Sequence, residues 1–342
     1  MRSALVMCVV ASLGCVPRAR PADPIQWNAA RRDCQRGAPD ACLWVGVSKV
    51  QQGDYVGAKK LFIDACDSGI VAACSQLAHA ALYGRGEPKD FERALTLAKR
   101  ACEQGNGAGC HLAGIVLYRR VNQDLAASTA YYARACAAEE PESCRDYGRA
   151  LNEGRGVPVD VARARALWRK TCPSDDSACS LLADSLHDGG ETATGLSVAQ
   201  EGCTAGGDAS CGTAGELLSK QGDKPLAARY LRTACAWGHK YSCSLLASLL
   251  VQMNPQLIDE ADLVWSESCR RGDKRDCYRL AEFRMTRTGR TEGEIEKIDA
   301  LCKGGLGEAC GWLCDAAQKD PTAATCKSAC KLGIKASCVA DQ

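Results

Sequence analysis

Cysteine is the residue whose type and spacing point most directly to chemistry in this chain. The sequence has 24 cysteines, and cysteine side chains form disulfides, bind zinc as thiolates or act as nucleophiles. Apart from Cys8 and Cys15, they sort into eleven neighbouring pairs. Ten pairs share a spacing of seven or eight residues, and the eleventh is Cys314 with Cys326. The ten are Cys34 with Cys42, Cys66 with Cys74, Cys102 with Cys110, Cys136 with Cys144, Cys172 with Cys179, Cys203 with Cys211, Cys235 with Cys243, Cys269 with Cys277, Cys302 with Cys310 and Cys330 with Cys338.

The spacing favours disulfides over zinc. Structural zinc sites usually take ligands two to four residues apart, with four ligands converging on one ion. A longer gap that recurs along the chain does not bring four thiolates together, and pairing leaves no thiol free to act as a nucleophile. The histidines are scattered without metal-ligand spacing, at His79, His111, His187 and His239. We therefore expect disulfides, no metal and no cofactor.

Each pair must be positioned by a reversal of the chain. On one continuous helix, residues eight apart lie about 12 Å from each other, which is beyond the roughly 7 Å limit for a disulfide. Glycine stands three residues after the first cysteine in eight of the ten pairs, and glycine commonly ends helices in the left-handed conformation. Each pair is therefore predicted to join the end of one helix to the start of the next.

Two further columns appear when the repeats are aligned on their cysteines. The position four residues before the first cysteine is often bulky, as in Phe62, Tyr132 and Trp168, and the position four residues after the second is small, as in Gly114 and Gly148. This pattern predicts a buried stripe and a close helix crossing. In the last repeat Cys314 and Cys326 occupy the small and the bulky column, which predicts a disulfide between the two helices of that repeat.

The recurrence fixes the expected fold class. The cysteine pairs recur roughly every 28 to 36 residues, and repeats of this length stack on their neighbours rather than around one central core. We predict an all-α protein, a right-handed α-solenoid of about nine helix–turn–helix repeats stapled by disulfides and flanked by capping helices. This solenoid is expected to occupy residues 25–342.

Two stretches carry a more specific pattern. Leu82-Tyr83, Gly84, Gly86 and Asp90, and again Gly148, Gly154, Gly156 and Asp160, are placed as helix-breaking glycines followed by an N-cap. They resemble the Sel1-like repeat, a relative of the tetratricopeptide repeat. With a cysteine pair in each repeat, the chain is similar to the secreted, cysteine-rich bacterial subfamily called Hcp-type proteins.

This resemblance implies two functions. The wider repeat family provides protein-interaction scaffolds, whereas some members of the cysteine-rich subfamily have been described as penicillin-binding proteins with weak β-lactamase activity. No catalytic residue can be transferred, because Ser328-Ala329-Cys330-Lys331 matches a Ser-x-x-Lys motif by letters only and its companion motifs are missing. We expect a protein without enzymatic activity; the alternative is a hydrolase acting on β-lactams or peptidoglycan.

The N-terminal residues read as an export signal. Residues 1–14 combine Arg2 with the apolar run from Ala4 to Leu13 and resemble a secretory signal. Ser12-Leu13-Gly14-Cys15 resembles a bacterial lipobox, which implies lipidation of Cys15; a plain cleaved signal is the alternative. Residues 15–24 are expected to be a tether. The predicted location is the cell envelope, as a lipoprotein of the periplasm or outer membrane, or the secreted fraction, and any membrane contact would be through that lipid.

The charge pattern limits the partners. The formal net charge is +2, with acids and bases interspersed, so the basic stripe required by nucleic acid is missing. On tetratricopeptide-like arrays the first helix of each repeat lines a concave face. The resemblance therefore suggests a groove at positions one, five and eight after the second cysteine, which lie on one helix face.

We expect a monomer that binds a protein, a peptide or a peptidoglycan fragment there. The alternative is that these residues merely face solvent. The candidate groove residues are His79, His111, Tyr118, Arg145, Arg149, Asn152, Asp184, His187, Glu216, Tyr278, Glu282, Asp315 and Gln318.

Overall fold

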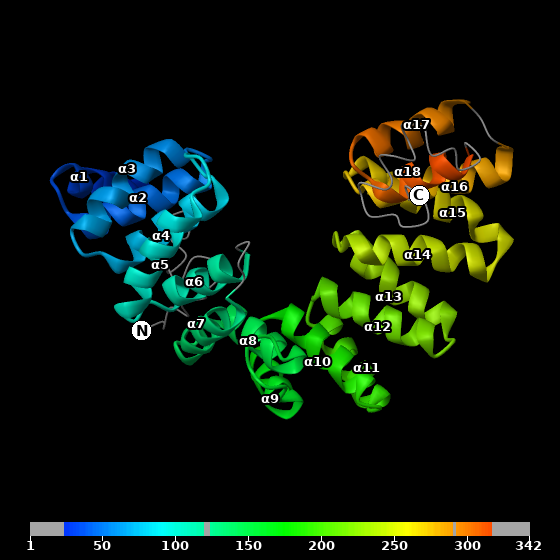
Figure 1. Cartoon of the computed structure of the whole chain (residues 1–342), viewed down its shortest axis with the longest axis horizontal. Helices are drawn as coiled ribbons and strands as arrows, with labels where there is room; N and C mark the ends of the chain where they lie inside the picture. Colours follow the sequence, from blue (N-terminus) through cyan, green and yellow to red (C-terminus); the bar gives the residue numbers. More distant parts are fainter. Residues whose placement is uncertain (1–23, 120–123, 290–291, 317–342) are drawn as a thin grey trace, which may run out of the picture. The chain divides into compact units, whose positions relative to one another are not determined.

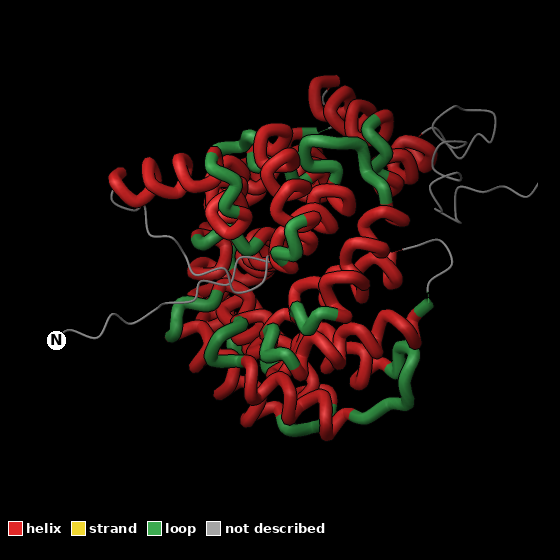
Figure 2. Tube along the Cα trace, turned by 90° about the vertical axis from the view of Figure 1, so that its left-hand side faces the viewer, coloured by secondary structure: helices red, strands yellow, loops and turns green. Residues whose placement is uncertain are grey.

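A computed structural model describes residues 24–119, 124–289 and 292–316. Within these ranges the chain forms 18 α-helices and one short 3₁₀-helix, with no strand (Figure 1, Figure 2). The predicted all-α fold is confirmed. The chain divides into two compact units, Met1–Ser185 and Leu186–Gln342.

The first unit runs from α1 to most of α10. Its helices are α1 (Pro24–Gln35), α2 (Pro39–Gln51), α3 (Tyr55–Asp67), α4 (Val71–Tyr83), α5 (Phe91–Glu103), α6 (Gly107–Arg119), α7 (Leu125–Ala137), α8 (Pro141–Glu153), α9 (Val161–Thr171) and α10 (Asp176–Asp188), the last of which ends in the second unit.

The second unit continues the same helical pattern. Its helices are α11 (Thr192–Thr204), α12 (Asp208–Lys220), α13 (Lys224–Ala236), α14 (Lys240–Met253), η1 (Pro255–Leu257), α15 (Ile258–Arg270), α16 (Lys274–Thr288), α17 (Glu292–Lys303) and α18 (Gly307–Ala316).

Consecutive helices pack side by side within each unit. Helices two apart in chain order also contact each other: α4 contacts α6, and α12 contacts α14. The even-numbered helices, each the first helix of a repeat, therefore form a row of their own within each unit. This is the row on which the candidate groove columns lie.

Disulfides link each odd-numbered helix, at or just after its end, to the next helix. Their Cα–Cα distances run from 4.5 Å to 4.9 Å, so the chain reverses between the two cysteines as the spacing requires. The nine bonded pairs at this spacing in the described ranges are Cys34 with Cys42, Cys66 with Cys74, Cys102 with Cys110, Cys136 with Cys144, Cys172 with Cys179, Cys203 with Cys211, Cys235 with Cys243, Cys269 with Cys277 and Cys302 with Cys310.

A left-handed residue makes the reversal possible in most of these pairs. The glycine three residues after the first cysteine has a positive φ wherever it is described, as at Gly105 (81°). In the Cys136–Cys144 pair, which lacks this glycine, Glu139 takes the same conformation with φ 61°. The turn thus imposes its backbone conformation even on a residue that carries a side chain.

Aspartates begin many of the second helices. Asp90 accepts a hydrogen bond from the Arg93 backbone N–H at 3.0 Å, and Asp160 accepts one from that of Arg163 at 2.9 Å. Both were predicted as N-caps, and both caps are present. The side-chain oxygen satisfies a donor that has no partner inside the helix.

The small and bulky columns pack against each other. Phe62, Tyr132 and Trp168 are at most 7% exposed, and the glycine four residues after the second cysteine lies against the bulky side chain of the same repeat. The core is therefore a series of small apolar clusters, each confined to neighbouring repeats, as expected for a stacked array.

Candidate binding site

The first unit contains a cavity of about 330 Å³, a volume within the range of small-ligand pockets. Its walls come from the even-numbered helices α4, α6 and α8, from α7, and from the loop that follows α8. The lining residues are His79, Tyr83, His111, Leu112, Ile115, Tyr118, Arg119, Leu125, Ser128, Thr129, Tyr132, Glu142, Arg145, Asp146, Arg149, Ala150 and Arg155.

Five of the predicted groove residues meet in this cavity. They are His79, His111, Tyr118, Arg145 and Arg149, and they come from three successive repeats. The column alignment thus identified residues that are far apart in the sequence and adjacent in the fold.

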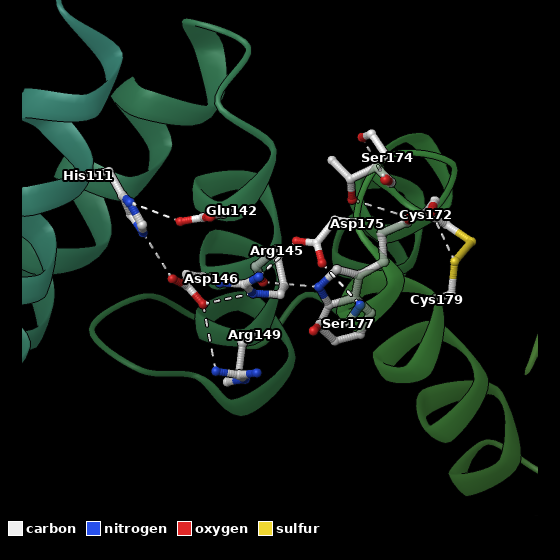
Figure 3. Close-up of polar contacts among 12 residues, drawn as sticks. His111, Glu142, Arg145, Asp146, Arg149, Cys172, Ser174, Asp175, Ser177 and Cys179 are labelled. Carbon is white, nitrogen blue, oxygen red and sulfur yellow. Dashed lines mark hydrogen bonds and ion pairs between the residues drawn. A yellow bond between two sulfur atoms is a disulfide. The ribbon is translucent and has the colours of Figure 1, made fainter. Parts of the chain in front are cut away.

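A polar network crosses one wall of the cavity. His111 Nε2 lies 3.1 Å from Asp146 Oδ2, and His111 Nδ1 lies 3.8 Å from Glu142 Oε2. Arg149 approaches the other oxygen of Asp146 at 3.6 Å (Figure 3). Burial alone would raise the pKa of the Asp146 carboxyl, but the hydrogen bond with His111 and the charges of Arg145 and Arg149 outweigh burial and lower it.

Arg145 extends the network to the next repeat. Its guanidinium donates to Asp175 at 2.8 Å and lies 3.4 Å from Asp146, while its backbone carbonyl accepts the Trp168 indole N–H at 3.0 Å. Asp175 in turn accepts from the Ser177 backbone N–H at the start of α10 (Figure 3). Arg145 is therefore largely committed to holding two repeats together.

The residue directly after the second cysteine, which is Arg145 in its repeat, also bonds the next repeat elsewhere in the chain. Ser75, the residue after the second cysteine of its pair, donates to Asn106 at 2.8 Å, and Asn106 also accepts the Gly109 N–H at the start of α6. The position after the second cysteine thus joins neighbouring repeats at Ser75, His111 and Arg145. Spacing alone had placed it with the binding positions.

Arginine and tyrosine side chains form another part of the cavity. Arg155 Nη1 donates to Tyr118 Oη at 2.8 Å, and its guanidinium carbon lies 5.5 Å from the centre of the Tyr118 ring. Arg119 lies 5.4 Å from the centre of the Tyr83 ring. These distances fit cation–π contacts, so both rings sit beside permanent positive charge.

The glycine loop after α8 positions Arg155. Gly154 and Gly156 both have positive φ, and a β-carbon at Gly156 would collide with the backbone of Leu125. The loop thus packs against the start of α7, and Thr129 Oγ1 donates to the Arg155 carbonyl at 2.7 Å. The sequence pattern predicts Gly154 and Gly156 as helix breakers, but it gives no sign that the arginine between them lines a cavity.

His79 is a buried, neutral side chain of the cavity. Its ring centre lies 4.5 Å from that of Tyr83. Burial, assisted by the charge of Arg85, lowers the pKa of His79 to about 4. At neutral pH this imidazole is uncharged and offers both a donor and an acceptor nitrogen.

The serine and threonine hydroxyl groups of the cavity are already engaged. Ser128 donates to the Gly114 carbonyl at 2.8 Å, and Thr129 donates to that of Arg155. Among the described residues, no group of three or more His, Cys, Asp or Glu side chains is arranged to hold a metal ion. The arrangement favours recognition by charge, hydrogen bonds and aromatic contact.

The other predicted groove residues lie outside the cavity. Asn152 accepts from Ser185 at 3.2 Å, His187 Nδ1 lies 3.0 Å from Thr192 Oγ1, and Tyr278 donates to Glu282 at 3.4 Å. Glu216 pairs with Lys220 on its own helix at 2.9 Å. Asp184 is half-buried and Asp315 is exposed.

Several predictions fall outside the described residues. They are the signal at residues 1–14, the lipidated Cys15, the tether up to residue 23, Gln318, Cys326, the pair of Cys330 with Cys338 and the Ser328–Lys331 motif. In the part of the chain that is described, no helix has both the length and the apolar character needed to cross a membrane.

Known proteins resemble this chain in both sequence and fold. The Sel1 repeat family matches residues 71–106 and 141–172, and these two ranges contain the two glycine-loop stretches. Cytochrome c oxidase assembly factor 7A of Xenopus laevis is 33% identical over 89 residues, which cover 23% of this chain. The chain matches only 38% of the length of that relative.

Two solved structures share the fold over much of the chain. A protective antigen of uropathogenic Escherichia coli with an SLR fold is 19% identical, with a TM-score of 0.57, and covers 91% of this chain and 71% of its own. A Sel1 repeat protein of Oxalobacter formigenes is 16% identical, with a TM-score of 0.58, and covers 68% of this chain and 100% of its own. These likenesses establish the repeat architecture.

Proposed function

Because the chain is a Sel1-like repeat protein, we propose that it is an exported scaffold that binds a segment of a protein or a peptide in the cavity of its first unit. The observation that carries this proposal is the cavity itself. Three successive even-numbered helices contribute charged and aromatic side chains to a single space of about 330 Å³.

Rigidity supports a binding role. Nine disulfides join successive helices in the described ranges, and the His111–Asp146–Arg145–Asp175 contacts fix the repeats around the cavity. A site that is already ordered loses less conformational entropy on binding. The scaffold therefore presents its side chains in a fixed arrangement.

The disulfides also support export. Bonds of this kind persist in oxidising compartments and are rare in a reducing cytosol. A chain that depends on one bridge in nearly every repeat would lose these constraints in the cytosol. Together with the signal-like residues 1–14, this favours the cell envelope or the secreted fraction.

A peptide selection with a cavity-filling variant tests the proposal. A displayed random-peptide library is selected on the oxidised chain, and the affinities of enriched peptides are measured by isothermal titration calorimetry. Ile115 lines the cavity and is only half-buried, so Ile115→Trp fills part of the space. Leu263 is 69% exposed on α15 of the second unit, and Leu263→Trp is the matched control.

We expect Ile115→Trp to weaken binding at least about tenfold, a loss of about 1.4 kcal/mol, and Leu263→Trp to leave it unchanged. Both variants should retain the far-UV circular dichroism spectrum of the wild type. Equal affinities for both variants, or a selection that enriches no peptide, would remove the cavity as the binding site.

A further inference from the structure

The cavity has an excess of positive charge on its walls. Four arginines line it, Arg119, Arg145, Arg149 and Arg155, against two carboxylates, Glu142 and Asp146. Guanidinium groups are always charged and hold a carboxylate through two parallel hydrogen bonds. An arginine-rich cavity therefore favours an anionic ligand, provided that some of these groups are available.

Two of the four arginines are committed to the fold. Arg145 pairs with Asp175 at 2.8 Å and lies 3.4 Å from Asp146. Arg155 pairs with Glu153 and donates to Tyr118. These two guanidinium groups shape the walls, and each makes two contacts with protein acceptors.

The other two arginines are available to a ligand. The Arg149 side chain is 37% exposed, and its only ion pair within the described ranges is a long one of 3.6 Å to Asp146, which also contacts His111 and Arg145. Arg119 is exposed at the end of α6. Its guanidinium lies over the Tyr83 ring, and no carboxylate of the described chain lies within ion-pair distance of it.

The remaining lining indicates which kind of anion fits. Glu142 and Asp146 lie on the same wall as Arg149, and their charges would repel a dense polyanion such as a polyphosphate. A peptide carries separated carboxylates and also backbone N–H groups. Glu142 and Asp146 can accept hydrogen bonds from these N–H groups. The rings of Tyr83 and Tyr118 offer apolar surface to its side-chain stems.

We propose that the cavity selects an acidic peptide segment, with a Glu or Asp carboxylate of the ligand bound by Arg149 and Arg119. This inference rests on the proposed function and specifies its ligand class. The neighbouring Glu142 and Asp146 accept backbone N–H groups of the same segment. Recognition thus combines two available cations with a wall that rejects more highly charged anions.

Paired peptides and paired variants test this inference. The probes are a fluorescein-labelled short peptide in which Glu alternates with Ala and its isostere with Gln at each Glu position. Fluorescence anisotropy is measured on the oxidised full chain for wild type, Arg149→Ala, Arg119→Ala and the control Arg169→Ala. Arg169 is an exposed arginine of α9 outside the cavity. Removal of Arg149 leaves Asp146 its contacts with His111 and Arg145, so the fold should persist.

We expect the Glu peptide to bind at least about tenfold more tightly than the Gln peptide, and Arg149→Ala and Arg119→Ala each to weaken it by about tenfold, since a charged hydrogen bond is lost. Arg169→Ala should match the wild type. Equal binding of the two peptides, or equal loss in all three variants, overturns the inference. If library-selected peptides without acidic residues still lose affinity in Ile115→Trp, the binding scaffold stands and only the ligand class is wrong.

Discussion

Gly148 of α8 lies against the indole ring of Trp168 of α9, so that a β-carbon added at residue 148 would stand 2.5 Å from Trp168 Nε1. The same indole N–H donates to the Arg145 carbonyl at 3.0 Å. The relationship recurs between Gly114 and Tyr132 and between Gly215 and Leu231, where the added carbon would approach the ring or side chain to 2.6 Å. A missing side chain on one helix thus makes room for a large one on the next.

The substitution Gly148→Ala should therefore destabilise the first unit. The added methyl group must displace a ring that is 1% exposed, and overpacking of this kind costs about 1–3 kcal/mol. Urea unfolding followed by circular dichroism measures the change. Gly293→Ala is the control, because a β-carbon there meets open space, and alanine in a helix is favoured over glycine by about 1 kcal/mol. Equal effects of the two substitutions would contradict the packing role of Gly148.

Much of the fold could be predicted from the regular spacing of the cysteine pairs. The spacing of seven or eight residues requires a chain reversal, and the side-chain sizes four residues away report which helix faces meet. Local rules also located the caps at Asp90 and Asp160. These features depend on residues within one or two helices. Because the sequence repeats, the same pattern can be recognised in many repeats.

The cavity could be predicted only in part. The columns brought His79, Tyr118 and Arg149 together, but they could not distinguish a side chain that faces the cavity from one that bonds the next repeat, as Arg145 does. Arg155 lies in a loop, where helical periodicity carries no information. Its direction depends on how the loop packs on Leu125, which is a contact between repeats.

Because His79 is neutral in the folded protein, the free energy of unfolding should decrease as the pH is lowered. Its pKa is lowered by burial from 6.5 to about 4. Above pH 6.5 the imidazole is neutral in both states and contributes nothing. As pH falls from 6.5 towards 4, the unfolded chain takes up a proton that the folded chain does not, so stability decreases by no more than about 3 kcal/mol.

The variant His79→Gln removes this titration. Urea unfolding of wild type and variant at pH 7 and at pH 4.5 measures the difference, and the wild type should lose more stability over this interval. The NMR chemical shifts of the His79 imidazole nitrogens should still be those of the neutral form at pH 5. A wild type that loses no more stability than His79→Gln would show that His79 titrates normally.

Asp276 is a carboxylate in a column of small residues. The position before the second cysteine is otherwise occupied by Ala, Gly or Ser, at Ala41, Ala73, Gly109, Ser143, Ala178, Ser210, Ser242 and Ala309. Asp276 is 0% exposed, and burial raises its pKa, an effect that the Ser244 and Ser268 hydroxyls only partly offset. We expect Asp276→Ser to stabilise the second unit by about 1–3 kcal/mol at pH 7, because a buried charge is removed.

The gain should depend on pH. At pH values below 3.8 the carboxyl group is protonated in both states, so wild type and variant should be close in stability. Between pH 3.8 and the raised pKa of the folded state, the unfolded chain releases a proton that the folded wild type retains, so the wild type loses stability and the gain should grow; above that pKa the gain should stay constant. Asp67→Ser, at an exposed position of α3, is the control and should change stability by less than about 0.5 kcal/mol. An Asp276→Ser variant less stable than wild type at pH 7 would refute the penalty.

The partner of Cys314 follows from the relationship between Gly148 and Trp168. Cys314 stands four residues after Cys310, as Gly148 does after Cys144, and Cys326 stands four residues before Cys330, as Trp168 does before Cys172. Cys314 is disulfide-bonded and 1% exposed, while Cys326 lies outside the described residues. If the last repeat keeps the register of the others, these two positions face each other and the bond is Cys314–Cys326.

Tryptic mapping without reduction tests this pairing, because the lysines separate the alternatives. Cleavage should release residues 298–303, 304–319, 320–327, 328–331 and 336–342, which place Cys326, Cys330 and Cys338 on different peptides. The Cys302–Cys310 bond joins the first two. We expect mass spectrometry to find 320–327 attached to them, and 328–331 attached to 336–342. If either of those last two is attached to 304–319 instead, the register of the preceding repeats does not extend to the last.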